Sequence, residues 1–275
     1  VPASLQANII AAGREWGFRY ADHGTHVLGT IGANRNGTGM HGVAFGADLT
    51  TARVFGDTYY EWRRQASGGY LPEAVERTDP DGAARLDMYA QLQAQGVRAI
   101  NHSWGISTRN MTVAALDAQY ARIGAGYDVY GSIYKDSANA PASQLIQVWS
   151  AGNGSGAVAG ITAALPRWKP EIEPYWLAVA NVRQPNTANG ETDYVINAGS
   201  SICGAAANWC ISAPGTAILS TIVSGDIQGR LEKTADYVRL LIDSQNPTYD
   251  YGLKTGTSMA APHITGALGL LMERF

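Results

Sequence analysis

The chain has few charges, and neither sign gathers into a run. Of its 275 residues, 16% are Asp, Glu, Lys or Arg, and the formal net charge is −3. Proteins that bind nucleic acid instead cluster Lys and Arg to neutralise phosphates. The missing basic patch therefore argues against nucleic acid as a partner.

Long apolar runs are missing as well. No stretch reaches the roughly 20 consecutive apolar residues that a membrane-spanning helix needs. The first residues, Val1-Pro2-Ala3-Ser4, lack the basic-then-apolar pattern of a signal peptide, although in a fragment that absence says nothing about secretion. With 45% hydrophobic residues and 32 glycines, the composition is that of a globular chain with many tight turns.

Only two cysteines are present, Cys203 and Cys210, with six residues between them. Several of those residues are small, so the loop can close, and we expect a disulfide. A disulfide would favour an oxidising compartment. The alternative is two free thiols, one of them buried. No His or other Cys lies nearby in sequence, which disfavours a metal site.

Short apolar runs alternate with helical stretches, and no repeat or linker interrupts them. The expected strands are 49–55, 97–103, 145–150, 176–182 and 218–222, and the expected helices are 26–33, 82–94, 112–123 and 257–274. This alternation favours a parallel sheet buried on both faces. We therefore expect one α/β domain over residues 1–275, with three layers and a mostly parallel central sheet covered by helices on both faces.

Two segments depart from this alternation. Residues 59–81 are polar and aromatic with little periodicity, which predicts a long surface excursion. Residues 224–251 are interpreted as a second insertion. Within it, residues 238–242 are expected to belong to a helix that starts near Gly229.

The segment Gly256-Thr257-Ser258-Met259-Ala260-Ala261-Pro262-His263 places a serine at the start of a helix. Proline is tolerated only near a helix start, so the helix begins around Thr257 or Ser258. Free N–H groups at a helix N-terminus stabilise negative charge, including the oxyanion of a reacting carbonyl. An isolated serine there is usually only an N-cap, but the complete run favours a nucleophile.

A serine hydroxyl is a weak nucleophile, and a neighbouring imidazole with a pKa near neutrality can take its proton. The segment His23-Gly24-Thr25-His26-Val27 offers two histidines one helical turn apart. Together with His41 they raise the alternative of a zinc site. We expect no metal, because the His-Glu-x-x-His pattern is absent and no acidic ligand shares the helix.

Two further motifs follow expected strands. In Ser150-Ala151-Gly152-Asn153-Gly154, an Asn amide held at a strand end can donate a hydrogen bond to an oxyanion. The other motif is Asn101-His102-Ser103-Trp104-Gly105. Taken alone, an Asn-Gly pair is usually a turn, and the other motif is a simple strand end.

These motifs resemble the serine, histidine and asparagine motifs of subtilisin-like serine peptidases, the subtilase family. The resemblance implies a serine endopeptidase that hydrolyses peptide bonds through an acyl-enzyme on Ser258. It assigns His23 as general base, and Asn153 with backbone N–H groups as oxyanion hole. His26 and His263 match structural positions. The residues that would pair with an extended substrate and line its first pocket are Ser103, Trp104, Gly105, Ala151 and Gly152.

The order of the motifs, with His first and Ser last, fits the family. The Gly-x-Ser-x-Gly elbow is absent, which disfavours an α/β-hydrolase esterase. The Cys203–Cys210 loop, the insertion before Gly256 and residues 37–46 are similar to autotransporter passenger peptidases. This similarity implies an extracellular or bacterial cell-surface location, and a membrane-anchored remainder of a longer precursor as a partner. The resemblance also implies protein or peptide substrates and no required cofactor. Calcium is frequent in the family, but its ligands cannot be placed here.

The Asp that completes the family's triad has no counterpart here. It should precede the histidine, where the only acids are Glu15 and Asp22. Asp22 is adjacent to His23 and cannot easily face its distal ring nitrogen, and no family motif surrounds Glu15. We expect the Asp-bearing strand to lie before Val1 and the domain to be incomplete at both ends. The rival hypothesis is therefore an impaired fragment or pseudo-peptidase that binds peptides without cleaving them.

Overall fold

The computed structural model describes residues 22–52, 58–76, 82–106, 109–128, 130, 145–233 and 237–275. The chain divides into two compact units. The larger contains residues 25–51, 82–221 and 251–275, and the smaller contains 1–24, 52–81 and 222–250. That the two units form one domain stays a prediction. In the described part, none of the helices combines the length and the apolar character that crossing a bilayer requires.

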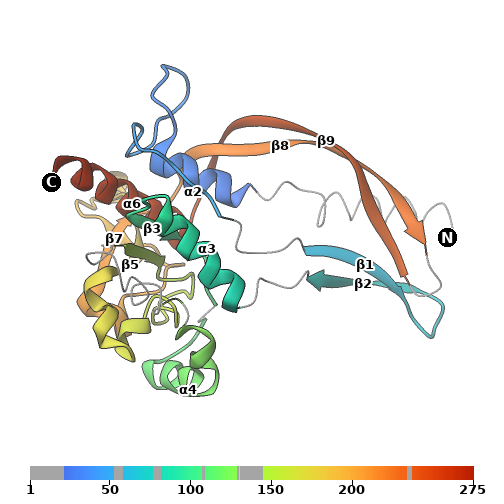
Figure 1. Ribbon diagram of the computed structural model, residues 1–275, viewed down its shortest axis with the longest axis horizontal. Coiled ribbons are helices and arrows are strands. Elements are labelled where there is room, and N and C mark those ends of the chain that lie inside the picture. Colours follow the sequence, from blue (N-terminus) through green and yellow to red (C-terminus); the bar gives the residue numbers. More distant parts are fainter. Residues whose placement is uncertain are drawn as a thin grey trace. The chain divides into compact units, whose positions relative to one another are not determined.

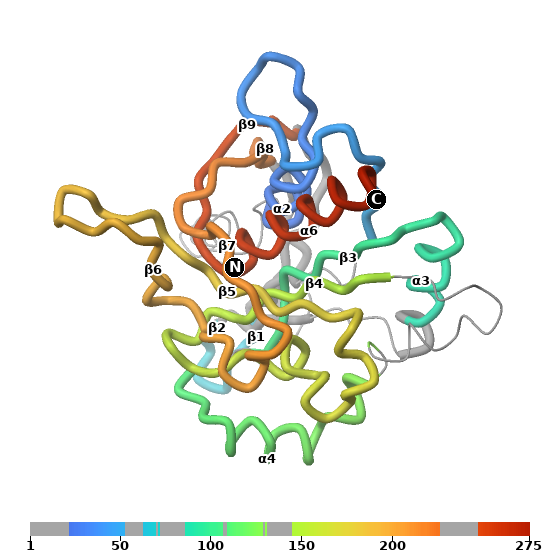
Figure 2. The backbone as a smooth tube through the Cα atoms, turned by 90° about the vertical axis from the view of Figure 1, so that its left-hand side faces the viewer, coloured from blue at the N-terminus to red at the C-terminus, as the bar shows by residue number. Residues whose placement is uncertain are grey.

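The larger unit is built around a mostly parallel sheet (Figure 2). Its strands are β3 (Ala99–His102), β4 (Ile146–Ser150), β5 (Trp176–Arg183), β6 (Val195–Ile196) and β7 (Cys210–Pro214). Strand β4 pairs in parallel with β3 and β5, and β7 is also parallel to β5. Among the described strands of this sheet, the short β6 alone is antiparallel, pairing with β5. The sheet confirms the expected α/β fold class.

One face of this sheet is covered by helix α6 (Thr257–Arg274). Val148 of β4 and Val179 of β5 form a buried cluster with Ala260 and Ala261 of the helix. The small side chains of Ala260 and Ala261 let α6 lie close to the strands.

Successive residues of a strand point to opposite sides of the sheet. The face opposite α6 carries large aromatic side chains. Trp149 stacks on His102 of β3 with ring centroids 3.8 Å apart, and on Trp176 of β5 at 5.4 Å. Tyr89 of helix α3 (Gly82–Ala94) packs against His102. Burial on both faces explains why β4 and β5 are mostly apolar in the sequence.

The described residues also contain the helices α2 (His23–Gly32) and α4 (Val113–Ile123) and the 3₁₀ turns η1 (Gly124–Gly126), η2 (Leu165–Arg167), η3 (Pro170–Tyr175), η4 (Thr187–Asn189) and η5 (Gly204–Trp209). Thr112 caps α4 by accepting a hydrogen bond from Ala115 N at 3.3 Å. The helices expected at 26–33, 82–94, 112–123 and 257–274 are found near their predicted positions.

Helix α2 lies beside α6 (Figure 2). A Cβ placed on Gly266 of α6 would come within 2.6 Å of Val43 and 3.4 Å of the Ile31 carbonyl, so the approach requires glycine. The start of β8 (Ile218–Lys233) also contacts α2, because Ser220 Oγ donates to His26 O at 2.8 Å.

The smaller unit contains an antiparallel sheet (Figure 1). Its strands are β1 (Thr58–Arg64), β2 (Tyr70–Glu76) and the long middle parts of β8 and β9 (Tyr237–Lys254), in the order β2-β1-β9-β8. Strand β1 pairs with β2 from Thr58↔Glu76 to Arg64↔Tyr70, and with β9 through Trp62↔Val238.

One prediction for these segments is wrong, because residues 238–242, expected to be helical, lie in β9. A five-residue segment is too short for periodicity to separate helix from strand, and pairing of β9 with β1 and β8 decides the outcome. Residues 59–81, expected to be a long surface excursion, contain most of β1 and all of β2, and 77–81 lie outside the described residues. Residues 49–52 form no strand, and the rest of the expected strand 49–55 lies outside the described residues.

Candidate active site

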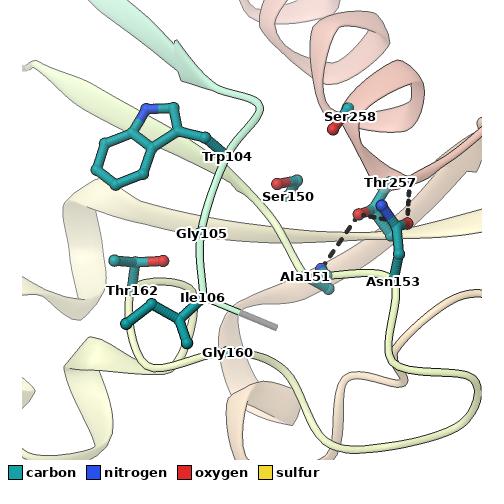
Figure 3. A pocket seen from close by; sticks show the side chains of 11 residues that line it. Trp104, Gly105, Ile106, Ser150, Ala151, Asn153, Gly160, Thr162, Thr257 and Ser258 are labelled. Atoms are coloured by element: carbon teal, nitrogen blue, oxygen red, sulfur yellow. Dashed lines mark hydrogen bonds between the residues drawn. The ribbon is translucent and has the colours of Figure 1, made fainter. Parts of the chain in front are cut away.

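A pocket of about 220 Å³ lies where β3 and β4 end and α6 begins (Figure 3). Ligand sites of parallel sheets gather at the carboxyl ends of the strands. The lining residues are Trp104, Gly105, Ile106, Ser150, Ala151, Gly152, Asn153, Gly160, Thr162, Thr257 and Ser258. None of these described residues carries an ionisable side chain, so the pocket suits uncharged groups.

Most of the predicted site residues come together in this pocket. Those that line it are Ser258, Asn153, Trp104, Gly105, Ala151 and Gly152. Ser103 lies beside the pocket and contacts Ser258. His23 is the first residue of α2, with an exposed side chain, and its role as general base stays a prediction.

Ser258 is the second residue of α6, after the N-cap Gly256. The first N–H groups of a helix have no carbonyl partner within the helix, and they favour negative charge nearby. The Ser258 hydroxyl donates to the Ser103 carbonyl at 3.1 Å in this structure. A reacting carbonyl beside Ser258 would therefore lie close to the positive end of α6.

Asn153 is tied to the same helix start. Its Oδ1 accepts hydrogen bonds from Thr257 N at 3.0 Å and from Thr257 Oγ1 at 3.2 Å. The Thr257 hydroxyl in turn accepts from Gly152 N at 3.1 Å. With the oxygen engaged, the two amide hydrogens are the donors that the Asn153 side chain has left. This arrangement can supply a hydrogen bond to an oxyanion at the helix start.

Two buried serines hold the loop that carries Asn153. Ser201 Oγ accepts from Gly154 N at 3.1 Å, and Ser201 N donates to Gly152 O at 2.8 Å. Ser200 O accepts from Gly156 N at 2.8 Å. Both serine side chains have no exposed surface, so the loop is fixed from behind by bonds that water does not reach.

The expected disulfide between Cys203 and Cys210 is present and closes the turn η5. Trp209 within that turn donates its indole N–H to Ala163 O at 2.8 Å. Gly160 and Thr162, just before Ala163, contribute the lower wall of the pocket. The disulfide loop therefore supports this wall.

Trp104 forms the wall opposite Asn153 (Figure 3). Its ring packs edge-to-face against Trp149 at 5.0 Å, Tyr130 at 5.3 Å and His102 at 5.8 Å. Such contacts fix the ring orientation as well as burying area. Burial lowers the pKa of His102 to about 3, so this histidine is neutral near pH 7.

Two histidines of the motifs have structural contacts. His26 is fully buried, and its Nε2 lies 2.9 Å from Ile218 O and 3.1 Å from Gly252 O. Because both partners are acceptors, Nε2 carries the hydrogen. His263 Nδ1 likewise donates to Met259 O at 2.8 Å, and burial lowers its pKa. Across the described ranges, no group of three or more His, Cys, Asp or Glu side chains is placed to hold a metal ion.

Five lining residues were not predicted as site residues. Ser150 and Thr257 lie within the motifs and Ile106 directly follows one, so proximity in sequence was the available signal. Gly160 and Thr162 carry no local signal, because the chain returns to the pocket only through the fold of the segment after Asn153. The serine pair 200–201 was missed for the same reason.

Residues 17–275 match the model of the subtilase family. The chain is 29% identical over 281 residues to an extracellular serine protease of Serratia marcescens, covering 93% of this chain and 24% of that protein. It is 26% identical to serotype-specific antigen 1 of Mannheimia haemolytica, covering 92% and 27% respectively. The chain thus spans about a quarter of the length of these relatives.

A solved structure gives the same fold. Fervidolysin from Fervidobacterium pennivorans, described as a keratinolytic enzyme related to subtilisin, superposes with a TM-score of 0.54 at 24% identity. The match covers 92% of this chain and 30% of that one. At this identity the likeness concerns the fold alone.

Proposed function

The chain belongs to the subtilase family and is by that membership a subtilisin-like serine peptidase, and we propose that it carries the catalytic site of an endopeptidase acting on proteins or peptides. The observation that carries the proposal is the placement of Ser258 and Asn153 in one uncharged pocket at the start of α6. A nucleophile and an oxyanion donor at a helix N-terminus suit acyl transfer.

In the proposed mechanism, Ser258 Oγ attacks the scissile carbonyl while His23 takes the hydroxyl proton. The carbonyl oxygen becomes an oxyanion, which accepts hydrogen bonds from the Asn153 amide and from backbone N–H groups. The tetrahedral intermediate collapses to an acyl-enzyme, and the leaving amine takes the proton from His23. Water then attacks the acyl group with His23 again as base, which releases the acid and restores Ser258.

We propose that the strand end after β3 binds the substrate. Backbone groups at Ser103 to Gly105 would pair with an extended peptide, with Ala151 and Gly152 facing them. The uncharged lining supports an uncharged substrate residue in the pocket, and Trp104 limits its size. The mechanism requires no cofactor.

A second candidate is a peptide-binding module that does not cleave its ligand. The observation that favours it is the hydrogen bond from the Ser258 hydroxyl to the Ser103 carbonyl, which points the reactive proton at a backbone group. The two candidates differ in whether Ser258 reacts.

A serine-directed phosphonate separates them. The natural protein that carries this sequence is treated with the reagent, and the adduct is located by peptide mass spectrometry. Labelling at Ser258 that is lost in Ser258→Ala and strongly slowed in His23→Ala supports the peptidase. A folded protein that stays unlabelled at Ser258 supports the binding module. Thermal unfolding of each variant controls for loss of structure.

We also propose that the natural protein acts outside the cell or on the bacterial surface. The similarity to autotransporter passenger peptidases supports this location, as does the name of the Serratia marcescens relative. The same similarity implies a membrane-anchored remainder of a longer precursor. Immunodetection in culture supernatant and on intact cells tests the location, and signal confined to the cytosol would contradict it.

A further inference from the structure

We propose that Ser103 is a positioning residue for the nucleophile Ser258, and that Asn101 and Thr265 hold Ser103 in this role. The inference rests on the proposed function of Ser258. It gives the Ser103 side chain a task different from the substrate contact expected from the sequence.

The first step concerns the Ser258 carbonyl. In an α-helix, the carbonyl of residue i accepts from the N–H of residue i+4. The residue four positions after Ser258 is Pro262, which has no N–H. Ser103 Oγ supplies the missing donor at 2.8 Å. The side chain of Ser103, the residue after β3, thus replaces a helical hydrogen bond at the nucleophile.

A second hydrogen bond runs the other way between the same two residues. Ser258 Oγ donates to Ser103 O at 3.1 Å. The pair therefore fixes both the backbone and the resting side-chain orientation of Ser258 against the end of β3. When the hydroxyl reacts, its own bond to Ser103 must break, but the bond to the Ser258 carbonyl remains.

The Ser103 hydroxyl is itself oriented by a relay. Asn101 Nδ2 donates to Ser103 Oγ at 2.9 Å, and Thr265 Oγ1 donates to Asn101 Oδ1 at 3.0 Å. The Thr265 hydroxyl also lies 3.3 Å from Ala261 O, and its shorter contact is the one with Asn101. The relay then runs in one direction, since the amide gives from nitrogen and accepts at oxygen. The relay begins and ends on α6, so the helix and β3 hold the nucleophile jointly.

Burial strengthens this relay. The side chains of Ser103 and Thr265 are 8% and 7% exposed. Hydrogen bonds shielded from water are costly to break without replacement. Ser103 does not line the pocket, and its hydroxyl already serves Asn101 and Ser258. Its removal should therefore change the rate of reaction at Ser258 more than the affinity for substrate.

The test compares kcat and KM for a peptide amide substrate, together with the phosphonylation rate of Ser258. Ser103→Ala removes the donor, Ser103→Thr keeps it, and Thr265→Val removes the start of the relay with little change of shape. We expect kcat of Ser103→Ala to fall about tenfold or more, because small misplacements of a reacting group are costly. KM should stay within about twofold. Ser103→Thr should recover most of the rate, and Thr265→Val should show a smaller loss in kcat.

Thr112→Ala is the control, because it removes the cap of α4, which lines no part of the pocket. It should lower the melting temperature and leave kcat unchanged. An increase in KM at constant kcat in Ser103→Ala would overturn the inference and return Ser103 to substrate binding. Unchanged kinetics would overturn it too. If Ser103→Ala fails to fold, the kcat of Thr265→Val decides. A wild-type protein unlabelled at Ser258 would instead defeat the proposed function.

Discussion

The side-chain oxygen of Asn153 accepts two hydrogen bonds from Thr257, one from its backbone N–H and one from its hydroxyl. A backbone N–H only donates, so the accepting atom must be the amide oxygen, and the orientation of the amide is fixed. The two ends of the Asn153 side chain therefore have separate tasks. The oxygen ties the loop to α6, and the nitrogen is left to donate.

This division makes Asn153→Asp an informative variant. Aspartate keeps oxygen acceptors for Thr257 but has no N–H to offer an oxyanion. We expect kcat to fall by about 10²–10³ with little change in KM, which is the size of the effect at the oxyanion-hole asparagine of a subtilisin. Steady-state kinetics check it, with unfolding curves to show that the fold is kept. Near-normal kcat would remove Asn153 from the proposed mechanism.

Gly256→Ala should damage both stability and catalysis. Gly256 has a φ of +156°, at the limit of the region that favours glycine. A Cβ there would lie 3.3 Å from Asn153 Nδ2. We expect a loss of about 1–3 kcal/mol in the free energy of unfolding, measured by chemical denaturation, and a lower kcat. The control is Gly126→Ala, because a Cβ at that position meets no atom within 4 Å. Equal stability of the two variants would contradict the prediction.

Removal of the disulfide should loosen the pocket wall. The double variant Cys203→Ala/Cys210→Ala opens the loop whose Trp209 holds Ala163. We expect the free energy of unfolding to fall by about 2–3 kcal/mol, since the closed loop is short. KM should rise because the pocket wall at Gly160 and Thr162 loses support. A reductant should have a similar effect on the wild type and none on the variant; a wild-type KM insensitive to reductant under conditions that open the bond would count against the coupling.

His102 should make stability depend on pH. Burial holds its pKa at about 3 in the folded protein, below the ordinary 6.5, so only the unfolded chain takes up a proton as pH falls below 6.5. The free energy of unfolding should therefore fall from about pH 6.5 toward pH 3, by at most about 1.4 kcal/mol per pH unit for this group. His102→Phe keeps an aromatic ring against Trp149 and lacks the proton.

The measurement is chemical denaturation of wild type and His102→Phe between about pH 7 and pH 5, above the range where most carboxylates titrate. The stability difference should shift in favour of the variant as pH falls. His263 is present in both proteins, so its own lowered pKa cancels in the comparison. Parallel pH profiles would show that the pKa of His102 is not lowered in the folded protein.

Much of the larger unit could be predicted from the sequence. Apolar runs such as 145–150 give strands because both sheet faces are buried. Residues 257–274 give a helix because Pro262 is tolerated near a helix start and the residues after it are mostly apolar or small. The motifs end at strand termini, and parallel strand termini converge, so Trp104 and Asn153 could be expected near one another.

Other features depend on contacts that no local pattern encodes. Residues 238–242 belong to a strand because β9 pairs with β1 on one side and β8 on the other. Thr162 reaches the pocket, and Ser201 reaches the Asn153 loop, only through the folded path of the chain. The relay from Thr265 to Ser258 likewise joins residues far apart in the sequence, and no pattern in either segment predicts it.

The ladder between β1 and β9 joins the two insertions of the chain. An engineer who wished to pare the protein to its catalytic scaffold could not delete one insertion and keep the other intact. Excising the β1–β2 hairpin would uncover the side of β9 that it pairs with, and excising the β8–β9 extension would leave a lone two-stranded hairpin, which has little stability in water. Deleting both insertions together leaves no unpaired strand.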